Sequence, residues 1–433
     1  MRKICLICFL VLPFSVLAAE PGSLQIDEKQ DYKRFTWGII PAAAFDSDLG
    51  FKYGAVFNLF DHGSHQKLPL FDQYLYIKLT NTTRGTLNAQ AVFESKSLIK
   101  NATLILEASY LKDKKMDFFG FNGLNAMYHP ALTNHSNPDF AGKFFYAHER
   151  DLLRLRADLQ KNLIDDKIRL LTGFTHNRFS ISPAMEKDAG SEQYGTSLFE
   201  NYKIWNIIKP EESRGGNINL INFGLIYDTR NEHCFCTDGI WVEAMFIYSP
   251  GFMSDADFSK LVLTYRQHAS TMNERITFSF RASSQQKLSG DIPFYMLPTY
   301  FDSRLSQDGL GGAFNLRGAL RNRIVSDGFL AGNFETKFKI SDFHLLGQYF
   351  YVSLSVFYDN AFVTQAYQTN LAEVPVDLRD FFFGNANQKI HHTFGTGLYI
   401  VFNRNNIITV NYGVPVNGQD GPGGLYIGSS LLF

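Results

Sequence analysis

The sequence predicts an all-β protein, a transmembrane barrel of sixteen antiparallel strands, and three observations lead to this fold class. Segments in which apolar and polar side chains alternate recur along the chain, and the connections between them differ systematically in length. Aromatic residues make up 15% of the chain and charged residues only 19%. A helical membrane protein would contain several apolar runs of about 18 or more residues, whereas this chain has one candidate, 4–19, at its start.

That apolar run has the composition of a secretory signal peptide. Two basic residues precede it, and small residues end it near Ala19. A basic start, an apolar middle and small residues at the end are typical of segments that are removed on export. We therefore expect a signal peptide at 1–19, a short periplasmic segment at 20–34 and the barrel at 35–433.

Sixteen segments alternate with the period of two that places successive side chains on opposite faces of a sheet. In the eighth segment, for example, Ile221 and Phe223 share one face and Asn222 lies on the other. In order, the segments are 35–46, 50–61, 70–80, 85–95, 102–111, 144–160, 167–177, 217–229, 239–249, 258–269, 274–287, 328–340, 348–360, 392–403, 406–414 and 423–433.

The lengths of the connections depend on whether the preceding strand is odd or even. Connections after even-numbered strands are short, as at 164–166 and 403–406, and several after odd-numbered strands are long, at 112–143, 178–216, 288–327 and 361–391. Outer-membrane barrels have short periplasmic turns and long external loops. A soluble exported all-β protein, the alternative, has no reason to separate loop lengths in this way. We therefore expect a barrel in the lipid of the bacterial outer membrane.

One long loop carries an arginine that two later acids can meet. The loop contains Gly311–Gly318, with Arg317 and Gly318 at its tip, and the next two strands carry Glu335 and Asp359 on their polar side. An arginine fork binds carboxylates through two parallel hydrogen bonds, which lysine cannot match. The sequence therefore predicts that this sixth external loop folds into the lumen, although an external loop with a surface arginine is the simpler alternative.

The composition argues against several other classes of function. The net charge of -1 attracts no nucleic acid. Cys234 and Cys236 lie in a predicted turn, where a local disulfide or a pair of thiols is the expected state, and His391 and His392 have no third metal ligand nearby. No Gly-x-Ser-x-Gly motif or catalytic triad is evident. We expect no metal, no cofactor and no enzymatic activity.

Several motifs resemble the bacterial surface antigen superfamily, which contains the BamA/TamA-type outer-membrane barrels. Leu316-Arg317-Gly318 resembles the tip of the family's sixth loop, and Glu335 and Asp359 fall where the family has the acids that this arginine meets. The remaining matches are Asp228-Thr229-Arg230-Asn231 with Gly239 in a periplasmic turn, Gly290–Tyr295 at the entry to the sixth loop, and Phe119–Gly123 in the third loop.

The chain departs from the family at two places. Ala319 follows the arginine-glycine pair, where the family places an aromatic residue, so the resemblance implies a less tightly packed tip. Only about fifteen residues separate the expected cleavage site from the first strand, whereas a domain needs about 50. The resemblance therefore implies a barrel-only branch that lacks periplasmic POTRA domains.

The first and last strands are expected to meet at a weak seam. Pro41 has no N–H for the ladder, and proline is usually confined to edges or bulges. Gly428 adds backbone freedom on the other strand, which ends at Phe433. The family's insertases are thought to open at this seam, although a fully paired seam with a harmless bulge at Pro41 is an equal alternative.

Three functions remain open on this evidence. The resemblance implies a role in outer-membrane biogenesis or transport, through protein assembly or translocation. A passive or plugged channel is the second, and a barrel whose external loops bind partners at the cell surface is the third. The expected partners are outer-membrane lipid and other outer-membrane or periplasmic proteins.

Overall fold

A computed structural model describes residues 34–63, 71–165, 167–184, 193–231, 236–304, 307–345, 348–384, 389–402 and 406–429 of the chain. The expected signal peptide, Cys234 and Phe433 lie outside these residues. No helix in the described ranges is long and apolar enough to span a membrane.

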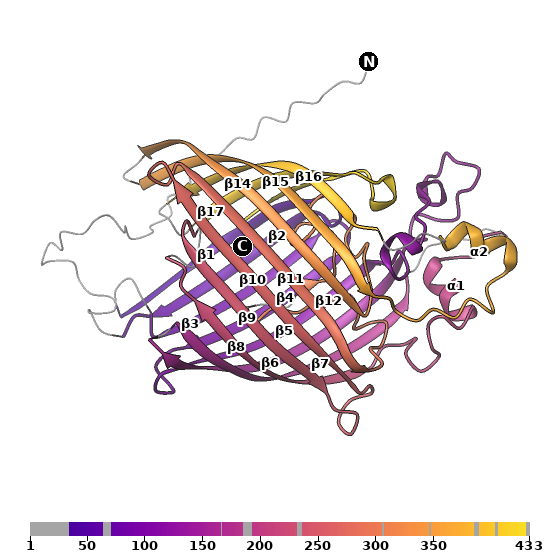
Figure 1. Cartoon of the computed structure of the whole chain (residues 1–433), viewed down its shortest axis with the longest axis horizontal. Helices are drawn as coiled ribbons and strands as arrows, with labels where there is room; N and C mark the ends of the chain where they lie inside the picture. The colour runs from indigo at the N-terminus through magenta and orange to yellow at the C-terminus, as the bar shows by residue number, and fades with distance from the viewer. Residues whose placement is uncertain are drawn as a thin grey trace, which may run out of the picture.

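Sixteen strands close into a single antiparallel barrel, which confirms the predicted fold class (Figure 1). Its strands are β1 (Phe35–Asp46), β2 (Gly50–Asp61), β3 (Gln73–Thr82), β4 (Thr86–Ser95), β5 (Ala102–Asp117), β6 (Ala147–Ile164), β7 (Ile168–Pro183), β8 (Asn217–Asp228), β9 (Gly239–Ser249), β10 (Phe258–Thr271), β11 (Ile276–Gly290), β14 (Gly328–Leu345), β15 (Gln348–Gln365), β16 (His391–Phe402), β17 (Asn406–Pro415) and β18 (Gly424–Gly428). Two short strands, β12 (Thr299–Tyr300) and β13 (Gln307–Asp308), pair with each other within the sixth loop.

Every predicted segment overlaps a strand of the barrel, but some ends differ. β5 continues to Asp117, β7 to Pro183 and β15 to Gln365, which is five or six residues beyond the predicted ends. These extensions lie at the end of the barrel with the long loops. On β7 the alternation continues there, but Phe179 and Ile181 now face inward, because the polar lumen gives way to an apolar cluster of loop residues at this end.

Alternation along the strands separates a polar lumen from an apolar outer wall. On β14, Phe334 is 48% exposed on the outside, whereas its neighbour Glu335 is 3% exposed. On β15, Val356 is 55% exposed and Asp359 is fully buried. An outward apolar band and a polar interior are what a barrel in lipid requires.

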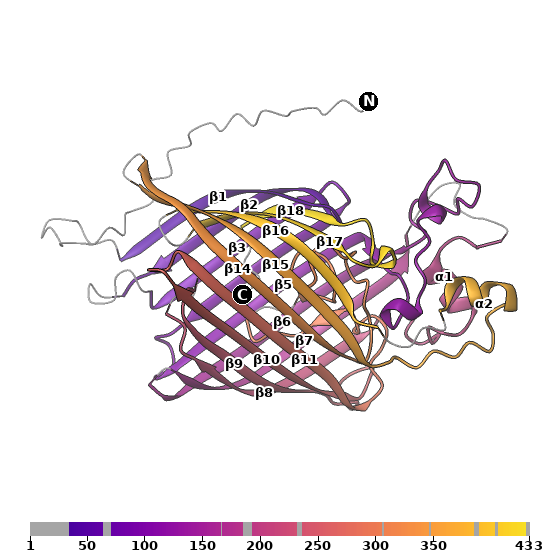
Figure 2. The same cartoon turned by 45° about the horizontal axis from the view of Figure 1, so that its top comes forward.

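The long external loops pack together beyond one end of the barrel. They contain α1 (Leu198–Ile204), α2 (Val376–Phe382) and the 3-10 turns Gly123–Asn125, Pro130–Thr133 and Gly418–Asp420. Figures 1 and 2 both show α1 and α2 side by side at this end. Trp205, at the end of α1, lies 5.8 Å from the ring of Phe382 in α2. Buried residues from these loops form one apolar cluster, so the loops support each other rather than extending separately into solvent.

The seam between β1 and β18 is short in the part of the chain that the structure describes. Paired residues there are Phe45 with Ile427 and Asp46 with Tyr426. In the same register Ala44 faces Gly428, yet this pair is not part of the ladder. By contrast, β1 pairs with β2 along its whole length from Phe35 to Asp46. Within the described residues, which end at 429, the ladder therefore covers Phe45 and Asp46 and does not include Ala44.

This difference in pairing predicts a difference in hydrogen exchange. Amides of residues 36–43 should on average exchange faster than those of 276–286, because β11 is paired on both sides over that range and exchange follows local opening. Mass spectrometry of the barrel in detergent or lipid would measure both segments. Equal protection of the two would contradict a weak seam.

Candidate functional site

The tip of the sixth loop is held by a buried arginine. Arg317 donates from Nε to Asp359 Oδ2 at 2.8 Å, from one terminal nitrogen to Asp359 Oδ1 at 3.0 Å, and from the other to Glu335 Oε2 at 3.0 Å. Its guanidinium carbon lies 3.5 Å from the centre of the Phe357 ring. Arg317 is 1% exposed. The structure thus brings the predicted loop arginine and both predicted acids together.

The two acids meet Arg317 because of the register between β14 and β15. Glu335 pairs with Phe357, and Asp359 lies two residues further along β15 on the same face. Neighbours at such a diagonal are within reach of a long side chain. The hydroxyl of Tyr399 donates to Glu335, and the Arg317 backbone N–H donates to Asp359 at 3.1 Å. These added hydrogen bonds matter, because buried charges are stable only when they are well paired.

Gly318 allows the loop backbone to lie directly against the wall. Its φ is +99°, and a Cβ atom there would lie 2.4 Å from the backbone carbon of Gly413 on β17. Its N–H donates to the Tyr426 hydroxyl on β18 at 3.1 Å. A side chain at either glycine would separate the two backbones. Leu316 and Ala319 are both buried in an apolar cluster at this tip, so the small residue at 319 leaves the tip enclosed.

Further ion pairs, which the sequence analysis missed, hold the loop to the opposite wall. Arg321 bonds to Asp308 of the same loop at 2.5 Å, and Arg150 on β6 reaches both Asp308, at 2.9 Å, and Asp113 on β5. Burial alone would raise the pKa of Asp308, but Arg150 and Arg321 outweigh it and hold that pKa below its ordinary value. The spacing of Arg317, Arg321 and Arg323 along one loop was the signal in the sequence that could have indicated these contacts.

Arg323 links the sixth loop to two other external segments. Its guanidinium donates to the carbonyl oxygens of Gly123, Ala126 and Gln419 at distances between 2.7 and 3.0 Å. The third loop and the connection between β17 and β18 are therefore held to the same side chain. The sixth loop is fixed at its tip, along its length and at its exit toward β14.

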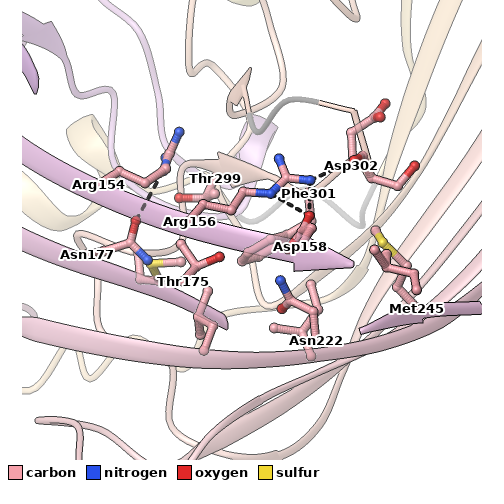
Figure 3. A pocket seen from close by; sticks show the side chains of 15 residues that line it. Arg154, Arg156, Asp158, Thr175, Asn177, Asn222, Met245, Thr299, Phe301 and Asp302 are labelled. Carbon is pink, nitrogen blue, oxygen red and sulfur yellow. Dashed lines mark hydrogen bonds and ion pairs between the residues drawn. The ribbon is translucent and has the colours of Figure 1, made fainter. Parts of the chain in front are cut away.

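A small cavity of about 20 Å³ remains between the sixth loop and the wall formed by β6 to β9 (Figure 3). The loop side is formed by Met296, Thr299 and Phe301, and the wall side includes Arg154 and Asn177. Arg156, which also lines the cavity, donates to the carbonyl oxygens of Ser303 and Arg304. The loop is therefore bonded directly to β6 beside the cavity.

The predicted periplasmic turn forms a separate cluster of contacts. Arg230 donates two side-chain hydrogen bonds to Asp228, at 3.0 and 3.1 Å, and its guanidinium carbon lies 4.4 Å from the Trp241 ring. Gly239 has a φ of +116°, and a Cβ there would lie 2.5 Å from the Thr229 oxygen. Arg169 on β7 also bonds to Asp228, at 3.3 Å. These contacts hold the two ends of the connection between β8 and β9.

The remaining sequence candidates have separate partners. His391 Nδ1 lies 2.8 Å from Asp420 Oδ1, whereas His392 Nδ1 lies 2.7 Å from the Tyr358 hydroxyl. In the described ranges no group of histidine, cysteine and acidic side chains has the arrangement of a metal site. Cys236 Sγ lies 3.1 Å from the Asp238 oxygen.

No protein-family model and no curated protein sequence matches the chain. Among solved structures, it is similar to BamA from Haemophilus ducreyi lacking POTRA domains 1–3, with 15% identity, a TM-score of 0.57, and coverage of 92% of this chain and 70% of that one. The fold is that of the BamA-type barrels. CdiB from Escherichia coli is 11% identical with a TM-score of 0.56, over 93% of this chain and 64% of that one. CdiB from Acinetobacter baumannii is 10% identical with a TM-score of 0.50, over 93% and 61%.

These comparisons confirm the resemblance to BamA/TamA-type barrels at the level of the fold, and the fold is one found in bacterial outer-membrane proteins. The chain spans slightly less than two thirds of either CdiB chain.

Replacing Arg317 tests how much the lumenal anchor stabilises the barrel. Arg317→Ala should lower the free energy of unfolding by about 3–5 kcal/mol, because it leaves two buried carboxylates without their cation. Arg317→Lys should have a smaller effect, since it keeps the charge and loses the fork. Thermal unfolding in detergent would measure both changes. Arg214→Ala, at an exposed arginine of an external loop, is the control and should shift stability by less than about 0.5 kcal/mol. Wild-type stability in Arg317→Ala would show that the anchor is dispensable.

Proposed function

We propose that this chain acts in outer-membrane biogenesis or transport, as a barrel that engages a client polypeptide at the seam between β1 and β18. The observation that carries the proposal is that the β1–β18 ladder ends at Phe45. The next pair in the same register, Ala44 and Gly428, is not part of the ladder. The BamA-type fold supports it. So does the resemblance of the loop motif to a family that includes proteins inserting or exporting other proteins.

A strand edge that is incompletely paired offers backbone groups to another chain. Its unpaired N–H and C=O groups can accept an extended segment by strand addition, in which main-chain hydrogen bonds give affinity. Pro41 cannot donate in such a ladder, so it limits how firmly β18 or any other strand closes on β1. The client in this proposal is therefore an extended segment that adds to β1.

The anchored loop suits this role because it can keep the lumen filled while the seam opens. Arg317 fixes the loop to β14 and β15, away from β1. The contacts of Arg321 and Arg150 fix it to β5 and β6. Opening at β1 would leave these anchors on other strands in place. We propose no enzymatic activity for the chain, and no cofactor.

Locking the seam tests the proposal directly. A Cβ atom at Gly428 would lie 3.9 Å from the Ala44 Cβ, which is the spacing that a disulfide needs. In a background with Cys234 and Cys236 replaced by serine, Ala44→Cys with Gly428→Cys should cross-link under oxidation. Growth and the outer-membrane protein content of the native bacterium should then fall, and reduction should restore them.

The control is a second disulfide that leaves the seam unlocked. Ala43 and Tyr53 face each other across β1 and β2, so cysteines there constrain the same strand on its other side. This variant should behave like wild type under oxidation. Full function of the barrel locked at Ala44 and Gly428 would rule out a role for seam opening.

A plugged channel is the second candidate, favoured by the loop that fills a sixteen-stranded lumen. Barrels of this size leave an aqueous channel when nothing occupies them. The wild-type barrel should therefore conduct poorly in a planar bilayer, and deletion of 300–325 should raise its conductance several-fold. Equal conductance of the two proteins would count against a plug. If the strain that carries this deletion grows like wild type, the loop is needed to close the channel but not to handle a client polypeptide.

A further inference from the structure

Three arginines project from β6 toward the lumen, and one of them has no acidic partner among the described residues. Arg150 is paired with Asp113, and Arg156 with Asp158. Arg154, between them, is 8% exposed, and its hydrogen bond is a donation from Nε to Asn177 Oδ1 at 3.1 Å. The terminal nitrogens of Arg154 therefore carry a charge that no carboxylate of the described residues neutralises by direct contact.

The acids whose charges act on Arg154, Glu107 and Asp308, already have other partners. Glu107 accepts a hydrogen bond from Gln90 at 2.9 Å and lies 4.0 Å from Arg156. Asp308 accepts hydrogen bonds from Arg150 and Arg321. Asp158, on the same strand as Arg154, is paired with Arg156. A rearrangement that gave Arg154 one of these acids would leave another buried arginine without its partner.

Arg154 and Asn177 line one end of the small cavity between the wall and the sixth loop, and Figure 3 shows them bonded to each other there. The Asn177 side-chain nitrogen is buried and has no acceptor among the described residues. This end of the cavity therefore presents hydrogen-bond donors and a positive charge. The volume of about 20 Å³ exceeds the roughly 10–15 Å³ that a water molecule needs and accommodates an ion of similar size.

We propose that Arg154 and Asn177 form a lumenal binding site for a small monovalent anion of the size of chloride. An unpaired buried cation is unfavourable, and an anion at its free nitrogens would neutralise it through charge-assisted hydrogen bonds. Asn177 would add a third donor from its amide nitrogen. The site is independent of the proposed function, since it lies on β6 and β7 rather than at the seam.

Other side chains of the same lining limit which anion can bind. Asp158 and Asn222 each have a buried side-chain oxygen without a donor among the described residues, and Asp302, which is paired with Arg266 and Arg304, also lines the cavity. Asp158 is four residues from Arg154 along β6, or about 13 Å between Cα atoms. An anion long enough to extend from Arg154 to these side chains would meet acceptors and carboxylates. The site therefore favours a compact ion over a sulfate ester or a larger acid.

Binding would tie the loop to the wall, because Thr299 and Phe301 of the sixth loop cover the same cavity. Chloride should therefore stabilise the folded barrel. In detergent, the wild-type Tm should be about 1–2 °C higher in sodium chloride than in sodium gluconate of equal ionic strength. Arg154→Gln should abolish this difference, and Asn177→Ala should reduce it while leaving the arginine in place. If Arg154→Gln fails to fold, Asn177→Ala alone decides the outcome.

The matched control removes a different lumenal charge. Lys78 lies on β3 outside the cavity, so Lys78→Gln should keep the full chloride effect. A second arm replaces chloride with formate. Stabilisation by formate alone would assign the site to a carboxylate rather than a halide.

Direct observation of the ion completes the test. Crystals grown in sodium bromide should show an anomalous peak within hydrogen-bond distance of Arg154 and Asn177. Absence of that peak, together with equal Tm values in chloride, formate and gluconate, would overturn the proposal.

Discussion

The buried contact of Arg317 with Asp359 and Glu335 is the interaction on which the interior of this barrel depends. A loop of this length loses considerable conformational entropy when it is ordered inside a barrel. One cation placed between two carboxylates, with Tyr399 and a backbone N–H completing the set, offsets part of that loss. The arrangement also explains the nearby glycines, since the guanidinium reaches both acids only where the loop backbone lies close to the wall.

The length of the strands differs around the barrel, and the longer strands lie where the sixth loop makes its contacts with β5 and β6. On the side of β1 to β4 the strands have at most 12 residues, and the external turns are short. On the side of β5 to β7 the strands have 16 to 18 residues. The external loops pack over this taller side, and the contacts of Arg321 and Arg150 lie against it. The side with the shorter strands also borders the seam. The strands that the loops do not cover are therefore next to the short β1–β18 ladder.

The strands could be predicted from the sequence because alternation is a local property. Phe334 and Glu335 lie on opposite faces of their strand, as do Val356 and Asp359. In each pair the apolar residue is the exposed one and the acid is buried, so polarity in the sequence indicates the face. The Arg317 contact was predictable from its motif and from the inward position of two acids. The contacts of Arg321 with Asp308, and of Arg323 with three carbonyl oxygens, were not, because they join segments whose proximity depends on how the loop turns. The end of the β1–β18 ladder also depends on register, which composition does not specify.

The hydrogen bond from Arg323 to the Gly123 carbonyl joins residues 200 positions apart, and this span has a consequence for how the protein assembles. Bringing distant segments together costs conformational entropy that grows with the length of chain between them. Those of the sixth loop involve β5, β6, β14, β15, β17 and β18, so no half of the barrel contains a complete binding surface for the loop. Gly318 and Gly413 meet only once β17 is in position. The loop can therefore complete its contacts with the wall only once β17 and β18 are in place.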